Sequence, residues 1–219
     1  MLQEKLSKYN IILASKSPRR QFLLKELGLD FEIRVKDVDE SFPQKLKGEK
    51  IALYLCRKKA EAFSNELKPN DLLITADTIV WIGNQVLNKP ADFNEAVKML
   101  KMLSGKMHTV YTGVCIGCYS PRPYRNGSFG RAFQGGVARF GVTGDVKMKT
   151  FAVSTKVFFK KLSDEEIDFY VTNYKPYDKA GAYGAQEWIG YVGVKKIIGS
   201  YFNVMGLPVR ELYEEMMKL

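Results

Sequence analysis

The sequence predicts an α/β fold, and three observations carry that prediction. Short apolar runs alternate with longer segments whose apolar residues recur at helical spacing. Hydrophobic residues make up 46% of the chain and charged residues 26%, which is the composition of a globular rather than a disordered protein. A chain of 219 residues is long enough to bury a sizeable core, and this one has no internal repeat or Pro/Ser-rich linker. We therefore expect a single domain over residues 1–219.

The first predicted elements are a buried strand over 10–14 and a helix over 19–27. Ser17 is a suitable N-cap, Pro18 suits the first helical position, and Gly28 suits the stop after the last turn. The later elements follow from apolar spacing and from turn and capping residues. They are expected as strands over 31–35, 72–75, 79–82, 85–87, 110–118 and 150–160, and as helices over 49–67, 92–103, 163–173 and 208–218.

The net charge and the numbers of cysteines and histidines limit the classes of function that this protein can have. Lys and Arg number 34 and Asp and Glu 24, and the formal charge of +10 favours a nucleic acid, a membrane surface or a polyanionic substrate. No apolar run approaches the ~20 residues that span a bilayer, and residues 1–10 lack the apolar core of a signal peptide. We therefore expect no membrane partner. The cysteines number only three, which favours the reducing cytoplasm as the location. The single histidine, His108, excludes a multi-histidine metal site.

The start of the first predicted helix carries unusual charges. Helix N-termini favour acidic residues because their first amides are unpaired, yet here the first turn holds Arg19 and Arg20. An anion at this position accepts hydrogen bonds from the free amides, both guanidiniums, Ser15 and Ser17. The alternative is a solvated pair of surface arginines. The strand-turn-helix context favours a phosphate or carboxylate site.

Several further polar residues are candidate site residues, although none of them is distinctive by itself. Asp77 follows a buried strand beside Thr78, and at a strand end it can face a cleft, ligate a metal ion or activate water; the alternative is a turn-forming aspartate. Lys59 and Lys89 by themselves look like common surface lysines. Gln186 lies in a Gly-rich segment, where it can read a base edge or belong to a structural turn.

Residues 119–150 form a basic, Gly-rich segment without clear periodicity. Six Lys and Arg against Asp145 give it a net charge of +5, and we interpret it as a long loop or extended hairpin inserted between two strands. Aromatic residues interleave with the basic ones, so a nucleic-acid-binding regulator is an alternative function. A solvated insertion is favoured, because no sequence-reading module is present. The residues concerned are Tyr119, Arg122, Tyr124, Arg125, Phe129, Arg131, Phe133, Arg139, Phe140, Lys147 and Lys149.

A zinc site is a second alternative. Cys115 and Cys118 are spaced as CxxC, and Cys56 with His108 brings the number of ligands to the four that a closed site needs. Buried cysteines that act as small hydrophobic residues are the favoured interpretation, since Cys115 lies in a predicted strand.

Seven short stretches form a joint pattern that is more specific than any one of them. They are residues 14–20, 76–80, 89–90, 103–105, 111–114, 178–184 and 199–208. In this order and spacing they resemble the Maf family, the septum-formation proteins assigned as nucleoside-triphosphate pyrophosphatases. The resemblance spans nearly the whole chain except 119–150. It implies a mixed sheet flanked by helices, similar to that of inosine triphosphatases, with a central substrate cleft.

The resemblance also implies a reaction and roles for the site residues. The reaction is hydrolysis between the α- and β-phosphates of a nucleotide, assisted by Mg²⁺ or Mn²⁺, and a homodimer is the expected assembly. Asp77 resembles the family's proton acceptor, and from sequence it can be base, metal ligand or both. The implied sets are Asp77, Lys59, Lys89 and Arg20 for catalysis, Ser15, Ser17, Arg19, Thr78 and Gln186 for substrate binding, and Glu40 with Asp77 for the metal.

Within the family, the Gly-Ala-Gln segment is similar to that of members acting on dTTP and UTP, with 7-methyl-GTP or another modified nucleotide as the alternative substrate. Two positions depart from the family pattern. Glu187-Trp188 follows Gln186 where many members have glycine, and Asn88 precedes Lys89 where many have glycine. Both positions bear on the rim of the expected pocket.

Overall fold

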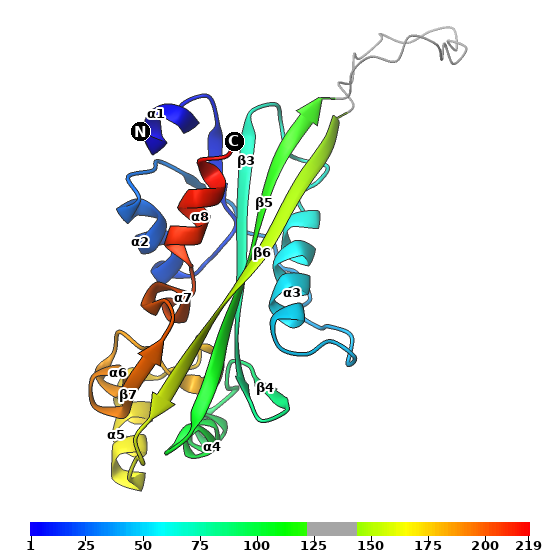
Figure 1. The fold of residues 1–219 in the computed structure, drawn as a ribbon. Helices are drawn as coiled ribbons and strands as arrows, with labels where there is room; N and C mark the ends of the chain where they lie inside the picture. Colours follow the sequence, from blue (N-terminus) through cyan, green and yellow to red (C-terminus); the bar gives the residue numbers. More distant parts are fainter. Residues whose placement is uncertain (122–143) are drawn as a thin grey trace, which may run out of the picture.

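The computed structural model describes residues 1–121 and 144–219, and a mixed sheet forms its centre (Figure 1). Within these residues the strand order is β2-β1-β3-β5-β6-β7, and β4 pairs with β3. β1 is parallel to β2 and β3, whereas every other pairing is antiparallel. The strands are β1 (Asn10–Leu13), β2 (Glu32–Ile33), β3 (Asp71–Ile82), β4 (Gln85–Leu87), β5 (Met107–Pro121), β6 (Gly144–Phe159) and β7 (Val194–Ile198).

Helices cover both faces of this sheet. Figure 1 shows α3 on one side of the long central strands and α1, α2, α7 and α8 on the other, with α4, α5 and α6 around the lower end. The predicted α/β class and the mixed sheet flanked by helices are thereby confirmed. The helices are α1 (Leu2–Leu6), α2 (Pro18–Glu26), α3 (Glu49–Glu61), α4 (Phe93–Leu103), α5 (Asp164–Tyr174), α6 (Trp188–Gly193), α7 (Tyr201–Met205) and α8 (Val209–Met216), and Ala180–Ala182 forms a 3₁₀ turn.

The apolar run of β3 is continuous because both of its faces are buried. Leu72 belongs to an apolar cluster shared with α1, α2 and α8, whereas the next residue, Leu73, packs with Cys56 and Ala60 of α3. A strand covered on one face alternates apolar with polar residues, but one covered on both faces does not. The sheet is therefore a central layer with helices packed on both faces.

The capping and turn predictions are confirmed where side chains define the ends. Asp92 accepts a hydrogen bond from the Glu95 amide at 2.8 Å at the start of α4. Ser163 and Glu166 form the complete capping box of α5. The turn before β4 joins the antiparallel pair Ile82 and Gln85.

Several predicted bounds are wrong. The strands expected over 72–75 and 79–82 are one strand, β3, because the polar residues between them pair with β5. The helix expected over 49–67 ends at Glu61, although Phe63 and Leu67 beyond it are still buried, so apolar spacing reports burial rather than helical backbone there. The strand expected over 31–35 shrinks to Glu32–Ile33, the part of this segment that pairs with the short β1. α1, α6, β7 and α7 were not predicted.

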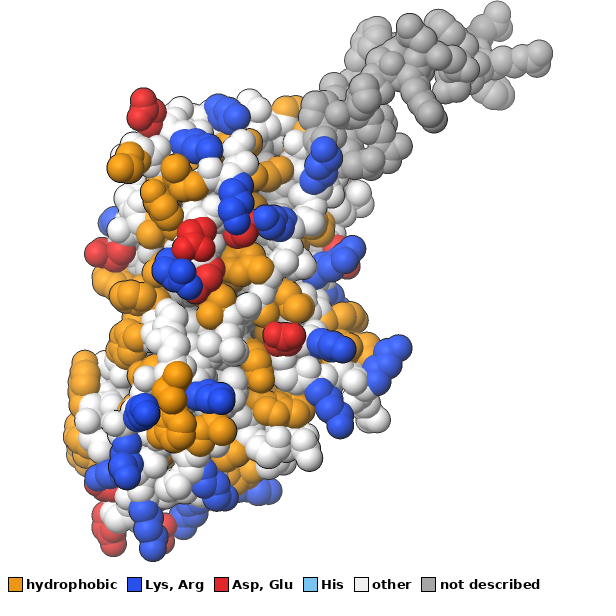
Figure 2. Space-filling view, in the orientation of Figure 1, with side chains coloured by type: hydrophobic (Ala, Val, Ile, Leu, Met, Phe, Trp, Pro, Cys, Tyr) orange, Lys and Arg blue, Asp and Glu red, His pale blue; other side chains and the backbone are white. Residues whose placement is uncertain are grey.

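The hairpin interpretation of 119–150 is tested only at its two ends. Residues 119–121 belong to β5 and 144–150 to β6, while the basic and aromatic residues between them lie outside the described residues. On the face seen in Figure 2, Lys and Arg side chains are interspersed with acidic ones, and the described residues of that face form no single basic patch. Over the described ranges, no helix is long and apolar enough to cross a membrane.

Candidate active site

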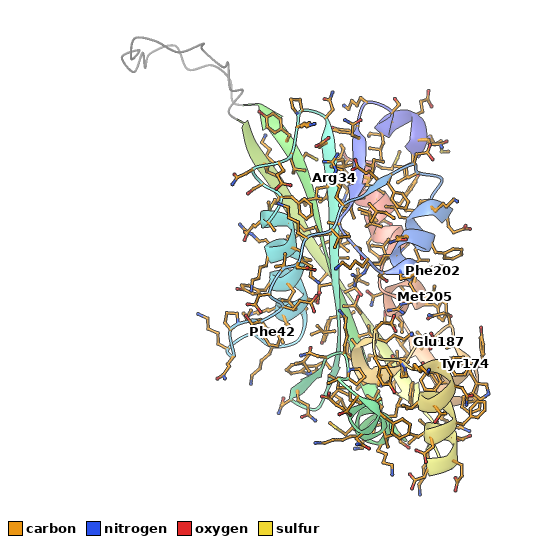
Figure 3. The ribbon with its side chains drawn as sticks, turned by 180° about the vertical axis from the view of Figure 1, so that it is seen from behind. Arg34, Phe42, Tyr174, Glu187, Phe202 and Met205 are labelled. Carbon is orange, nitrogen blue, oxygen red and sulfur yellow. The ribbon has the colours of Figure 1, made fainter. Side chains whose placement is uncertain are left out.

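A cavity of about 620 Å³ opens beside the centre of β3. Its wall comes from the start of α2, the second half of α3, the segments before α3 and α4, and residues around 178–186 and 204–206. Figure 3 shows the wall residue Met205 at the end of α7. Ten site residues are expected from the sequence, and all of them line this cavity: Ser15, Ser17, Arg19, Arg20, Glu40, Lys59, Asp77, Thr78, Lys89 and Gln186.

Asp77 lies in the middle of β3, so the prediction that it ends a strand is wrong. β1 stops pairing at Ile74, and β4 starts pairing only at Val80. Between these points β5 pairs with one edge of β3, while the other edge has no strand neighbour among the described residues. The cavity opens at this gap. Asp77, which is 7% exposed, lines the cavity, and β5 pairs with its backbone along the other edge of β3.

Gly113 lets α3 approach the sheet beside Asp77. It pairs with Asp77 across β3 and β5, and a Cβ placed on it would lie 2.4 Å from the carbonyl oxygen of Ala52 in α3. Real side chains do not tolerate such a distance, so only glycine permits this packing. The close approach of α3 brings Lys59, near its end, within hydrogen-bonding distance of the Asp77 carboxylate.

Lys59 also binds a second carboxylate. Its Nζ lies 2.8 Å from Oε1 of Glu40, and Nζ of Lys89 lies 3.7 Å from Oε2 of the same residue. Burial raises the pKa of Glu40, but the Lys59 hydrogen bond and the nearby positive charges outweigh burial and hold the pKa below its usual value. Glu40 is therefore ionised at neutral pH, and two carboxylates and two ammonium groups share this end of the cavity.

Arg20 also lines the cavity, and three hydrogen bonds hold its guanidinium. Its Nε donates to the Gly206 carbonyl at 2.8 Å, one Nη donates to Thr78 Oγ1 at 2.9 Å, and the other donates to Ser15 Oγ at 3.4 Å. Burial lowers the pKa of Arg20, while the charges of Asp77 and Glu40 raise it. Arginine keeps its charge in proteins, so a fixed cation faces the cavity 2.9 Å from the residue that follows Asp77.

The start of α2 presents the free amides that the sequence predicts. No acceptor is found within the described residues for the amides of Arg19 and Arg20, as expected in a first helical turn. Ser17 is the N-cap residue, but its hydroxyl makes no capping bond; its amide instead donates to Ser15 Oγ at 3.2 Å. Two unpaired amides, the Ser17 hydroxyl and two guanidiniums thus meet at one helix end, which suits a phosphate group.

Gln186 enters the cavity from a tightly built loop. The loop passes close to β3 because Gly181 has no Cβ, which would lie 2.9 Å from Cγ2 of Val80. A 2.8 Å hydrogen bond between the Tyr183 hydroxyl and Nε2 of the buried His108 ring holds the loop in place. Oε1 of Gln186 is buried and has no hydrogen-bond partner among the described residues. A buried acceptor without a donor costs about 1–3 kcal/mol, so this atom is well placed to accept a bond from a ligand.

Comparison with known proteins agrees with this arrangement. A family model described as Maf, Maf-like protein, matches residues 10–219. The chain belongs to the Maf family. It is 50% identical over 214 residues to a dTTP/UTP pyrophosphatase of Flavobacterium johnsoniae, covering 98% of this chain and 97% of that one. It is 48% identical over 215 residues to a dTTP/UTP pyrophosphatase of Bacteroides thetaiotaomicron, covering 98% of both chains.

Two further charged residues, Asp178 and Lys179, line the cavity of this Maf protein but were not predicted as site residues. Arg19 Nη1 lies 2.9 Å from Asp178 Oδ2, and Asp178 Oδ1 lies 2.6 Å from Nζ of Lys179. Burial raises the pKa of Asp178, but Lys179 and Arg19 outweigh that effect and lower the pKa overall. The Asp178-Lys179 pair stands within one of the family stretches, and that position is the signal that could have found it.

The four proposed zinc ligands do not come together. Cys56 of α3 and Cys115 of β5 belong to one apolar cluster, where burial raises their pKa values, that of Cys115 to about 12. His108 belongs to a separate part of the core, where burial lowers its pKa to about 4 and Tyr183 is its hydrogen-bond partner. Nowhere in the described ranges do three His, Cys, Asp or Glu side chains form a group that can hold a metal ion.

Proposed function

We propose that this Maf protein hydrolyses dTTP and UTP to the nucleoside monophosphate and pyrophosphate. The observation that carries the proposal is that Arg19, Arg20, Lys59 and Lys89 line the same cavity as Asp77, beside the free amides of a helix start. Phosphoryl transfer needs positioned positive charge more than covalent chemistry. The printed names of the relatives in Flavobacterium johnsoniae and Bacteroides thetaiotaomicron support the same reaction.

The phosphates belong at the basic end of the cavity. The start of α2, with Arg19, Arg20 and Ser17, offers oriented donors to phosphate oxygens. Lys59 and Lys89 lie on the Glu40 side, where they can stabilise the negative charge that develops on departing pyrophosphate. Asp77 lies at the open edge of β3, and we assign to it the proton of the attacking water.

Glu40 and Asp77 fit a divalent cation as its protein ligands. Both carboxylates approach the same ammonium group, that of Lys59, and both face the cavity. Mg²⁺ is commonly bound by one or two carboxylates together with substrate phosphates and water, so two protein ligands suffice. When bound, Mg²⁺ or Mn²⁺ polarises a phosphoryl oxygen and lowers the pKa of a bound water.

The base specificity rests on Gln186. Uracil and thymine carry a hydrogen on N3, which can be donated to the buried, unpartnered Oε1 of Gln186. Cytosine has an acceptor at N3, so its N3 offers no hydrogen to this oxygen. A site built to bond a substrate N–H strongly rejects an analogue that lacks it. This complementarity supports dTTP and UTP as substrates over CTP.

A panel of nucleotides tests the proposal. Pyrophosphate release is measured with dTTP, UTP, CTP, the purine triphosphates and 7-methyl-GTP in Mg²⁺ or Mn²⁺. We expect release from dTTP and UTP above all others, with the monophosphate as the second product. Release from none of them contradicts the activity, orthophosphate without pyrophosphate contradicts the bond cleaved, and preference for 7-methyl-GTP contradicts the base assignment.

A further inference from the structure

Glu187 follows Gln186 in the chain, but its side chain points behind the cavity wall. It is absent from the cavity lining, and its side chain is 20% exposed. Figure 3 shows Glu187 beside the helix α5 that carries Tyr174. Its carboxylate accepts a hydrogen bond from the hydroxyl of Tyr170, a fully buried residue of α5, and its Oε1 lies 3.0 Å from Nζ of Lys179. Glu187 thus joins the loop of Gln186 to two fixed groups.

The loop is shaped around this carboxylate. A Cβ on Gly184 would lie 2.7 Å from Cδ and 2.9 Å from Oε2 of Glu187, so the absence of a side chain there makes room for the carboxylate. The Gly184 amide donates to the Tyr170 hydroxyl at 3.0 Å, and the Glu187 amide donates to the Gly184 carbonyl at 3.0 Å. Because Gly184 and Gln186 both line the cavity, this anchor fixes the wall from behind.

Lys179 explains why the anchor is a carboxylate. It is 7% exposed, and a buried ammonium needs negative partners. It has two, Asp178 at 2.6 Å and Glu187 at 3.0 Å, and Asp178 in turn pairs with Arg19 at 2.9 Å. Positive and negative side chains therefore alternate along a chain of contacts that runs from the cavity to the core. Their order is Arg19, Asp178, Lys179 and Glu187, and Glu187 contacts the buried Tyr170.

We propose that Glu187 is the positioning residue for base selection: its bonds to Tyr170 and Lys179 hold the loop so that the Gln186 amide meets N3–H of uracil or thymine. This inference rests on the proposed function and deepens it. It concerns affinity and base choice rather than the hydrolytic step, because Asp77, Lys59 and Arg20 lie on β3, α3 and α2, outside this loop.

The variant Glu187→Gln tests the inference. Its amide oxygen can still accept the Tyr170 hydrogen bond, but an NH₂ group then faces the Lys179 ammonium, and two donors repel each other. We expect KM for UTP to rise about tenfold and the ratio of kcat/KM for UTP over CTP to fall about tenfold, with kcat changed less than threefold. Tyr170→Phe removes the other half of the anchor outside the cavity and is expected to act in the same direction.

Glu166→Gln is the matched control. Glu166 is a glutamate of α5 that pairs with Lys160 at 2.6 Å and caps the helix, and it does not line the cavity. Its loss lowers stability without touching the loop of Gln186, so the UTP over CTP ratio stays at the wild-type value. Melting temperatures of all variants separate loss of fold from loss of position.

The outcomes distinguish the two proposals. If the unaltered protein releases no pyrophosphate from UTP, the proposed function fails. If it does so with a preference over CTP, and folded Glu187→Gln keeps the wild-type KM and ratio, the role of Glu187 is refuted. A uniform fall of kcat with both nucleotides also refutes it, because a positioning role for base choice changes the ratio.

Discussion

Lys59 contacts Asp77 and Glu40 with one ammonium group, although the three residues come from α3, β3 and the segment before α3. Two carboxylates that face the same cavity repel each other, and the lysine between them offsets that repulsion. The contact depends on the distance between α3 and the sheet, which Gly113 sets. The reaction at Asp77 therefore depends on how α3 packs against the sheet. The first prediction below tests the carboxylate of Asp77, and the second tests the packing at Gly113.

Replacing Asp77 by asparagine is expected to lower kcat by about 10²–10⁴-fold, because the amide keeps the shape of the side chain but cannot take a proton from water. Pyrophosphate release from UTP measures the effect, and circular dichroism verifies the fold. Asp71→Asn is the matched control, since Asp71 is also buried in β3 but contacts Lys68 and Arg34 away from the cavity. Similar kcat values in both variants would remove Asp77 from the reaction.

Gly113→Ala is expected to weaken both stability and activity. The added Cβ would lie 2.4 Å from backbone of α3, so the helix must move away from β5, at a cost of about 1–3 kcal/mol of unfolding free energy. Lys59 moves with the helix, and kcat falls too. Thermal unfolding and UTP hydrolysis measure the two effects. Gly117→Ala on the same strand is the control, because its Cβ would meet Val146 at an ordinary 3.5 Å; equal losses in both variants argue against the packing explanation.

Many residues that line the cavity could be predicted from the sequence, because the type of a side chain indicates which groups it can bind. Arg19 and Arg20 at a helix start indicate an anion whatever the details of the fold. The place of Asp77 was not predictable, since an open edge in the middle of β3 depends on where β1 and β4 stop pairing, and that is a property of three strands together. Glu187 was visible only as a departure from the family pattern, because its partner Tyr170 lies 17 residues away along the chain.

Removal of divalent cations is expected to abolish turnover, and Mg²⁺ or Mn²⁺ to restore it. Glu40→Gln keeps the side-chain shape but loses the charge that its neighbours hold ionised. The Mg²⁺ concentration for half-maximal rate is expected to rise about tenfold or more in this variant. Asp39→Asn is the control, since Asp39 adjoins Glu40 but bonds Ser41 and Lys58 and does not line the cavity. An unchanged Mg²⁺ dependence in Glu40→Gln excludes Glu40 as a metal ligand.

His108 is expected to make the fold sensitive to acid. Burial lowers the pKa of its ring to about 4 in the native protein, whereas an unfolded histidine titrates near 6.5. Between these values the unfolded chain binds more protons, so the free energy of unfolding falls as the pH falls from about 6.5 to 4. His108→Gln keeps a hydrogen-bonding group near Tyr183 but does not titrate. Between pH 7 and pH 4 it is expected to lose up to about 3 kcal/mol less unfolding free energy than the unaltered protein. Urea unfolding at both pH values, followed by tryptophan fluorescence, measures this difference, and equal losses in the two proteins would show that the His108 ring is not the acid-sensitive group.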